Sequence, residues 1–142
     1  MFYIIEALFV GFYTNLLYFL FSFLNIDINI YILLFIIGFI KHLFGYFLWL
    51  HYYYCNYGEK CLNIRNDNND KNDNKDFYIS NKKPLIIDSI FEGLFFIYFG
   101  SILKLQIKSK YILFFILGFL IHILSELLGI HRYFCINKCI KK

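Results

Sequence analysis

The sequence predicts an all-α integral membrane protein whose four transmembrane helices form two tandem-repeated helical hairpins. Three observations lead to this fold class: an apolar composition, four long apolar blocks, and a stretch of sequence that occurs twice. Hydrophobic residues make up 60% of the 142-residue chain and charged residues only 17%. A soluble domain of this length has too little interior to bury so much apolar surface, so lipid is the expected solvent. The abundance of Phe, Tyr, Ile, Asn and Lys is typical of AT-rich genomes, such as those of large DNA viruses or apicomplexan parasites.

The four apolar blocks are each close to the ~20 residues that a helix needs to cross the hydrocarbon core. Helices are expected rather than strands, because in lipid the backbone amides must be hydrogen-bonded within their own segment. The first block lacks the basic region of a signal peptide, so we expect it to be a retained transmembrane helix. The blocks comprise residues 2–24, 30–54, 85–103 and 111–130.

The connections divide the chain into three parts. Residues 1–61 are the first hairpin repeat, residues 62–83 a flexible linker rich in Asn, Asp and Lys, and residues 84–142 the second hairpin repeat with a basic tail. The linker is too polar to fold alone. Four spans place both termini and the linker on one side, which carries ten basic residues against three on the other. The positive-inside rule therefore predicts that the termini and linker are cytosolic.

The repeated stretch comprises residues 31–55 and 111–135, which align without a gap and are identical at 12 of 25 positions. The preceding apolar blocks also match, because "IIEALFVG" (4–11) corresponds to "IIDSIFEG" (86–93). A two-span unit returns the chain to its starting side, so its copy has the same orientation. The halves are thus expected to be related by an approximate two-fold axis along the membrane normal.

Each copy contains the motif His-x8-His-x3-Cys and a further Cys, which places one imidazole and two thiols near the end of a span. Thiolates and imidazoles bind zinc, although no paired Cys-x2-Cys signature is present. In helix count and cysteine sidedness the layout also resembles quinone-coupled disulfide-forming membrane enzymes, whose Cys-x-x-Cys motif is absent. Structural thiols, or disulfides in an oxidising lumen, are the third interpretation. The residues of this metal-or-thiol set are His51, Cys55, Cys61, His131, Cys135 and Cys139.

Ionisable residues inside the apolar blocks form a second candidate set, because charges in a membrane are costly and usually mark partners or a pathway. Glu92 and His122 are expected at similar depth, so a cluster of Glu92, His122 and Glu126 is feasible in the second hairpin. His42 and His51 are expected on opposite faces of one helix. Three interpretations are open. One is structural polar pairing, in which Lys41 snorkels or pairs with an acid. The others are a proton or ion pathway and haem ligation by His42 and His122. The set comprises Glu6, His42, Asp88, Glu92, His122 and Glu126.

Small residues recur at equivalent positions of the two copies. They let helices approach closely in lipid, so we expect them to mark helix-packing faces. These residues are Gly11, Gly38, Gly45, Gly93, Gly118 and Ser125.

The function that the sequence favours is non-enzymatic: a structural, assembly or partner-binding role in a membrane. The chain contains no catalytic triad or phosphate-binding loop, and no basic stripe that would indicate nucleic-acid binding. The expected partners are the lipid bilayer and either further copies of the chain or other membrane proteins. A small proton- or ion-coupled transporter or channel is the alternative, and a thiol-redox or metal-binding membrane protein the third. No cofactor is predicted, and zinc is the candidate metal for the metal-or-thiol set.

Overall fold

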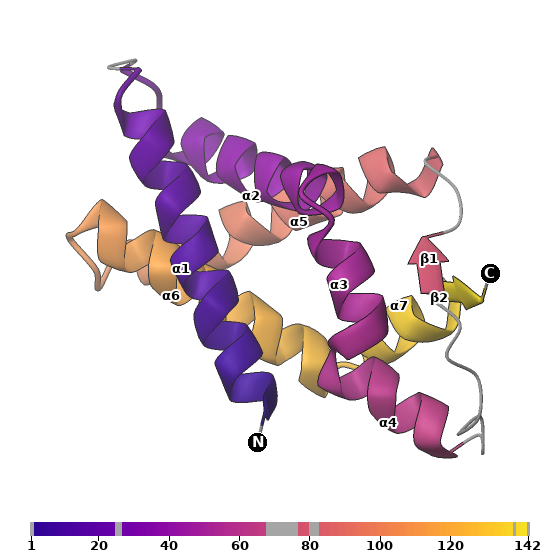
Figure 1. Cartoon of the computed structure of the whole chain (residues 1–142). Helices are drawn as coiled ribbons and strands as arrows, with labels where there is room; N and C mark the ends of the chain where they lie inside the picture. The colour runs from indigo at the N-terminus through magenta and orange to yellow at the C-terminus, as the bar shows by residue number, and fades with distance from the viewer. Residues whose placement is uncertain (1, 25–26, 68–76, 80–82, 138, 142) are drawn as a thin grey trace.

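The computed structural model describes residues 2–24, 27–67, 77–79, 83–137 and 139–141, which are predominantly helical (Figure 1). Four of the helices are long and apolar enough to cross a membrane, which confirms the predicted spans and is consistent with an integral membrane protein. They are α1 (Phe2–Ser22), α2 (Ile30–Phe47), α5 (Lys83–Leu103) and α6 (Lys110–Leu127). Shorter elements lie at one end of the bundle: α3 (Leu50–Tyr57), α4 (Glu59–Asp67), α7 (Ile130–Asn137), β1 (Phe77–Ile79) and β2 (Cys139–Lys141).

The two short strands were not predicted. β1 and β2 pair antiparallel, with Tyr78 opposite Ile140. This pairing and the end of α4 occupy parts of the segment that the sequence predicts to be a linker, at residues 62–67 and 77–79. The prediction of a flexible linker also concerns residues 68–76 and 80–82, which lie outside the described residues.

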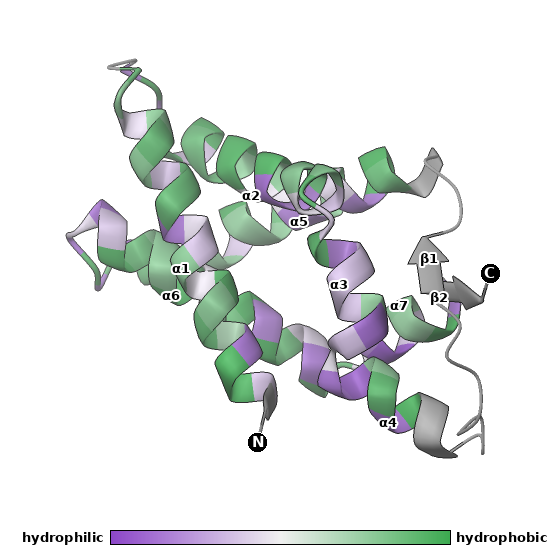
Figure 2. Ribbon diagram, in the orientation of Figure 1, coloured by the Kyte–Doolittle hydropathy of each residue, from purple (hydrophilic) through white to green (hydrophobic). Residues whose placement is uncertain are grey.

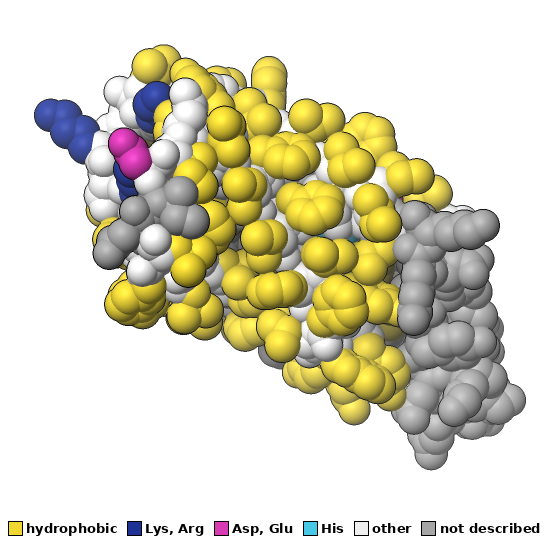
Figure 3. Space-filling model, turned by 90° about the horizontal axis from the view of Figure 1, so that it is seen from above, with side chains coloured by type: hydrophobic (Ala, Val, Ile, Leu, Met, Phe, Trp, Pro, Cys, Tyr) yellow, Lys and Arg dark blue, Asp and Glu magenta, His cyan; other side chains and the backbone are white. Residues whose placement is uncertain are grey.

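The outer surface of the four long helices is apolar. Figure 2 shows hydrophobic residues along these helices and polar residues concentrated around α3, α4 and α7. Large apolar side chains point outward, so that Phe12, Phe91 and Ile86 are each more than half exposed. In the view of Figure 3 this apolar surface is continuous and charged side chains gather at one end. Such a surface is stable in contact with lipid and would be a liability in water.

The long helices pack mainly across the two predicted hairpins. α1 lies along α6 and α2 lies along α5, whereas the sequence neighbours α1 and α2 share much less contact, as do α5 and α6. The expected hairpins therefore exchange partners, so that each helix of the first half is paired with one from the second. Four glycines mark these contacts: Gly11 meets Phe115, Gly118 meets Val10 and Thr14, Gly38 meets Glu92 and Phe96, and Gly93 meets Phe35.

Gly118 is the tightest of these approaches, and its replacement by Ala should be destabilising. An added Cβ would lie 2.3 Å from Thr14 Oγ1 and 2.9 Å from the Val10 carbonyl oxygen. α1 and α6 would have to separate, which we expect to cost about 1–3 kcal/mol. Thermal unfolding in detergent measures this loss. Gly45→Ala is the matched control, because its Cβ would lie 3.4 Å from the nearest heavy atom, His51 Nε2; equal stability of the two variants would contradict the close packing.

The half of the bundle remote from the short elements has a closed apolar core. Phe96, Phe114 and Leu34 are completely buried there, and Leu117 lies beside them. Further apolar side chains from the α1–α2 and α5–α6 ends, among them Ile28 and Ile107, pack against this core. Among the described residues, the ionisable side chains inside the predicted apolar blocks therefore lie in the other half of the bundle, whereas Lys104 and Lys108 lie in the remote α5–α6 connection.

Two helix breaks define the polar end. Trp49 has a φ of 62° between α2 and α3, and Gly129 has a φ of 74° between α6 and α7. A residue in the left-handed region ends a helix by turning the chain away from its axis. The predicted second and fourth spans are consequently shorter than the apolar blocks, and their last residues fold back as α3 and α7. Glycine adopts this conformation without strain, whereas a tryptophan does not.

Candidate functional site

Two disulfides join the halves of the chain at the polar end. Cys55 of α3 is bonded to Cys139 of β2, with a Cα–Cα distance of 5.6 Å, and Cys61 of α4 to Cys135 of α7, at 5.2 Å. Cys55 and Cys135 therefore lie at the same end of the bundle. All four sulfur atoms are used in these bonds, and a disulfide sulfur does not provide the thiolate that zinc binds. Of the three interpretations of the cysteines, the structure contains the disulfide arrangement.

The four histidines form two close pairs beside the disulfides. The ring centroids of His42 and His51 are 4.7 Å apart, and those of His122 and His131 are 4.5 Å apart. The prediction that His42 and His51 lie on opposite faces of one helix is wrong, because it assumed an unbroken helix. The turn at Trp49 folds α3 back so that His51 lies over His42, and Gly129 does the same for α7.

Glu92 belongs to the first histidine pair. Its carboxylate accepts a hydrogen bond from Lys41 Nζ, and its Oε2 lies 3.7 Å from His42 Nδ1. The expected cluster of Glu92 with His122 and Glu126 is therefore not formed. The reason is helix pairing: α5, which carries Glu92, packs against α2 instead of α6. Asp88 lies one turn before Glu92 and is partly buried.

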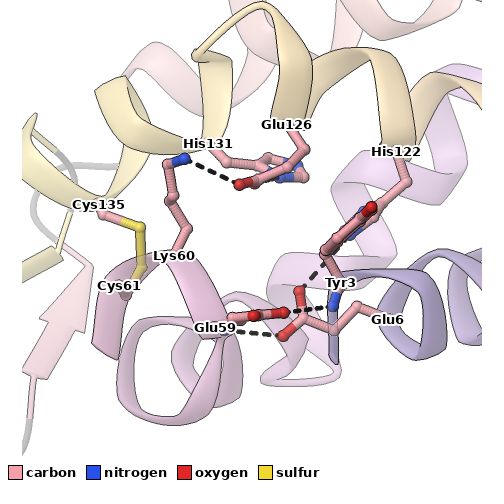
Figure 4. A network of polar contacts seen from close by, with 9 residues as sticks. All are labelled: Tyr3, Glu6, Glu59, Lys60, Cys61, His122, Glu126, His131 and Cys135. Atoms are coloured by element: carbon pink, nitrogen blue, oxygen red, sulfur yellow. Dashed lines mark hydrogen bonds and ion pairs between the residues drawn. A yellow bond between two sulfur atoms is a disulfide. The ribbon is translucent and has the colours of Figure 1, made fainter. Parts of the chain in front are cut away.

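The second pair lies in a larger polar network, shown in Figure 4. Glu126 accepts hydrogen bonds from His131 Nδ1 at 3.0 Å and forms an ion pair with Lys60 Nζ at 2.9 Å. Glu6 accepts a hydrogen bond from the Glu59 backbone amide at 2.9 Å. The Glu6 Oε2 atom also lies 3.7 Å from His122 Nε2. This network ties α1, α4, α6 and α7 together.

A cavity of about 200 Å³ lies between the two histidine pairs. We call it the four-histidine cavity. It is lined by all four histidines, by the Lys41–Glu92 ion pair, and by Ser125 and Tyr54 among others. Imidazole nitrogens both donate and accept hydrogen bonds, and the enclosing walls are mostly apolar. This combination is typical of a small-ligand site in which a few polar groups fix orientation.

A second cavity, of about 790 Å³, lies between α1, α3 and α4. Apolar and aromatic residues form most of its wall, and Glu6, Glu59, Tyr54 and His122 line its polar part. Tyr54 and His122 line both cavities. We call it the lateral cavity.

The sequence did not identify Tyr54, Glu59 or Lys60. The Tyr54 ring lies 5.2 Å from that of His131, although the sequence interpretation treats this tyrosine only as part of an aromatic belt. Glu59 and Lys60 follow the second apolar block in a polar stretch, where charged residues are ordinary. Only the folding back of α3 and α4 brings these three side chains to the histidines.

Burial keeps the interfacial histidines uncharged. Desolvation and the neighbouring His42 lower the pKa of His51 to about 3. Desolvation and the neighbouring His122 lower the pKa of His131 to about 4, although the Glu126 carboxylate opposes the shift. An imidazole normally titrates near pH 6.5. Both rings are therefore neutral at pH 7 in the folded protein.

These pKa shifts predict that acid destabilises the protein. Between pH 6.5 and about 4 the unfolded chain binds a proton at His131 that the folded chain does not, so stability falls as the pH falls through this window. The contribution of His131 is up to about 3 kcal/mol. Thermal unfolding between pH 6.5 and 5 measures it, above the range where ordinary carboxyl groups titrate. The dependence of stability on pH should be weaker in His131→Gln. An unchanged dependence would show that folding does not lower the pKa of His131.

No protein-family profile matches the chain, and neither a curated protein nor a solved structure shows detectable similarity to it. Among the residues that the structure describes, no group of three or more His, Cys, Asp or Glu side chains is arranged to hold a metal ion.

Proposed function

We propose that this chain is a non-enzymatic membrane protein that binds a ligand or partner at its disulfide-linked end. The observation that carries the proposal is the four-histidine cavity, in which all four histidines and the Lys41–Glu92 pair surround one space of about 200 Å³. Histidines and buried acids inside a membrane bundle indicate a functional site by default. The disulfides hold the elements that bear His51 and His131, so the site is preorganised.

The rest of the bundle favours binding over conduction. A path for protons or ions needs polar groups or water along its length. Beyond the cavity the described helices pack around the closed apolar core that contains Phe96, Phe114 and Leu34. The four-histidine cavity therefore lies on one side of an apolar core, which a binding site allows and a continuous polar path does not.

Native mass spectrometry of the protein released from detergent tests the proposal. We expect the wild type to retain a bound small molecule and Ser125→Leu to lose it, because Ser125 lines only the four-histidine cavity. Ser101→Leu is the matched control, since Ser101 lies on α5 and lines neither cavity. If the wild type retains no molecule that Ser125→Leu loses, the proposal is wrong.

A proton-coupled transporter is the second candidate, and one observation favours it. The ionisable pair of His122 and Glu6 lies 3.7 Å apart and is largely buried, which is a suitable arrangement for passing a proton. Proteoliposomes loaded with a pH-sensitive dye distinguish the two functions. Proton flux that disappears in His122→Gln and Glu92→Gln would replace the binding proposal, whereas flux equal to that of empty liposomes supports it.

The internal repeat is part of this proposal. If the chain arose by duplication, its two halves contribute equivalent residues to the site. Support comes from equivalent contacts: Gly38 packs on Glu92 and Phe96, while Gly118 packs on Val10 and Thr14. Val10 and Glu92 are equivalent in the alignment, as are the two glycines. The two helix breaks, at 49 and 129, are also equivalent. An experimental structure whose halves do not superpose would overturn the duplication.

The orientation in the membrane is also a proposal, and here the two signals conflict. The basic residues favour a cytosolic linker, whereas paired cysteines persist in oxidising compartments. We favour the second signal, because the short α5–α6 connection carries Lys104 and Lys108, and short connections count most in the charge rule. The variant Asn68→Thr creates a glycosylation acceptor at Asn66 and tests this in microsomes. A glycan on Asn66 supports a lumenal linker, and an unmodified protein supports the cytosolic one.

A further inference from the structure

The lateral cavity contains two buried polar groups without a hydrogen-bond partner. Among the described residues, three buried side-chain atoms lack such a partner, and two of them, Tyr54 Oη and His122 Nε2, belong to residues that line this cavity. His122 is only 9% exposed. Leaving a buried donor or acceptor unpaired costs about 1–3 kcal/mol, so native proteins satisfy nearly all of them. Both residues also line the four-histidine cavity, so the two atoms lie where the cavities adjoin, and a ligand that reaches this point would provide the missing hydrogen bonds.

The walls of the lateral cavity indicate a lipid-like ligand. Its apolar wall includes Ile5 and Phe9 of α1 and Tyr53 of α3, each more than half exposed on the surface of the described protein. Ile5 and Phe9 belong to a candidate membrane span, so in a bilayer they would face acyl chains and the cavity would open toward the lipid. Its volume of about 790 Å³ is within the ~300–1,000 Å³ typical of small-molecule sites.

The acidic residues disfavour an anionic head group. Glu6 and Glu59 line the cavity and would repel a phosphate or carboxylate. The carboxylates already accept hydrogen bonds, Glu6 from the Glu59 amide and Glu59 from the Tyr3 amide. Desolvation and the charge of Glu6 raise the pKa of the Tyr54 hydroxyl, which therefore remains a donor. A lipid hydroxyl can accept from Tyr54 and donate to an imidazole nitrogen, so it satisfies both groups at once.

We propose that the lateral cavity binds an uncharged lipid through its hydroxyl group, which is hydrogen-bonded by Tyr54 and His122 while its apolar part lies along α1. This inference extends ligand binding to a second cavity and names the class of ligand that this cavity takes. It assigns the ligand to the lateral cavity, which Ser125 does not line. The two proposals can therefore fail separately.

Fluorescence quenching in phosphatidylcholine nanodiscs tests the inference. Trp49 is the one tryptophan of the chain and precedes Leu50, a residue of the cavity wall. Diacylglycerol with brominated acyl chains should quench Trp49 at a lower mole fraction than brominated phosphatidylcholine does. The same lipid acetylated at its hydroxyl, and brominated phosphatidic acid, should quench no better than phosphatidylcholine. Stronger quenching by either of these lipids would overturn the proposal.

The variants assign the binding to the named groups. Tyr54→Phe removes one hydrogen bond and should weaken diacylglycerol binding about fivefold, equivalent to about 1 kcal/mol. Tyr133→Phe is the control, because Tyr133 is exposed and lines neither cavity. Ser125→Leu should leave the quenching unchanged even where it abolishes ligand retention in the four-histidine cavity. Unlabelled diacylglycerol and cholesterol compete as two sources of a lipid hydroxyl; relief of quenching by either supports the inference, and relief by neither refutes it.

Discussion

Removal of both disulfides should lower the free energy of unfolding by roughly 7 kcal/mol, more than twice the loss caused by removing either one. The bonds are nested, with sequence separations of 84 and 74 residues. While one bond is intact, the other closes only a small ring made of residues 55–61 and 135–139. In the chain-entropy description such a ring is worth about 3 kcal/mol and the large loop about 4.5 kcal/mol. Helices that persist in the unfolded state would reduce the contributions of the small ring, of the large loop and of both bonds together, but would preserve their order.

Three variants under non-reducing conditions test the nesting: Cys55→Ser with Cys139→Ser, Cys61→Ser with Cys135→Ser, and all four together. Denaturant unfolding in detergent gives the free energies. The two pairwise variants should lose similar amounts, and reduction of the wild type should reproduce the fourfold variant. If the fourfold variant were as stable as either pairwise variant, the second bond would contribute nothing and the nested arrangement would be excluded.

The four spans were predictable because they depend on properties local to each segment. Length and apolarity of a block are enough to identify a membrane helix. The ends of the second and fourth spans were harder to predict. Gly129 is a recognisable helix stop, but its counterpart Trp49 adopts the same left-handed conformation without any local signal. One wrong helix boundary then placed His51 on the wrong face.

The residues of the site were predictable, but many of their partners were not. Buried acids and histidines stand out in an apolar block, so Glu92 and His122 could be identified by composition alone. Their partners depend on which helices pack together, and this is decided by close approaches such as that of Gly38 to Phe96. Spacing also could not distinguish thiol, metal and disulfide interpretations of the cysteines, because each bond joins two segments far apart in the sequence.

Replacing Lys41 with Met should destabilise the protein by about 3–5 kcal/mol. Lys41 and Glu92 form an ion pair between α2 and α5, and their side chains are 11% and 16% exposed. Without the ammonium group, Glu92 becomes a nearly buried carboxylate whose nearest remaining cationic candidate is His42, at 3.7 Å. Breaking a buried pair by removing one partner is costly because the other charge remains uncompensated. Thermal and denaturant unfolding in detergent give the loss.

The double variant Lys41→Met with Glu92→Leu separates the cost of an unpaired charge from the worth of the pair. It should recover most of the stability lost by Lys41→Met, because an apolar pair of similar volume often replaces a buried ion pair at little cost. Lys104→Met is the matched control, since Lys104 lies at the other end of the bundle over the Tyr31 ring and its loss should cost at most about 1 kcal/mol. A double variant no more stable than Lys41→Met would mean that the Lys41 side chain stabilises the bundle by packing, and that Glu92 is not held by its charge.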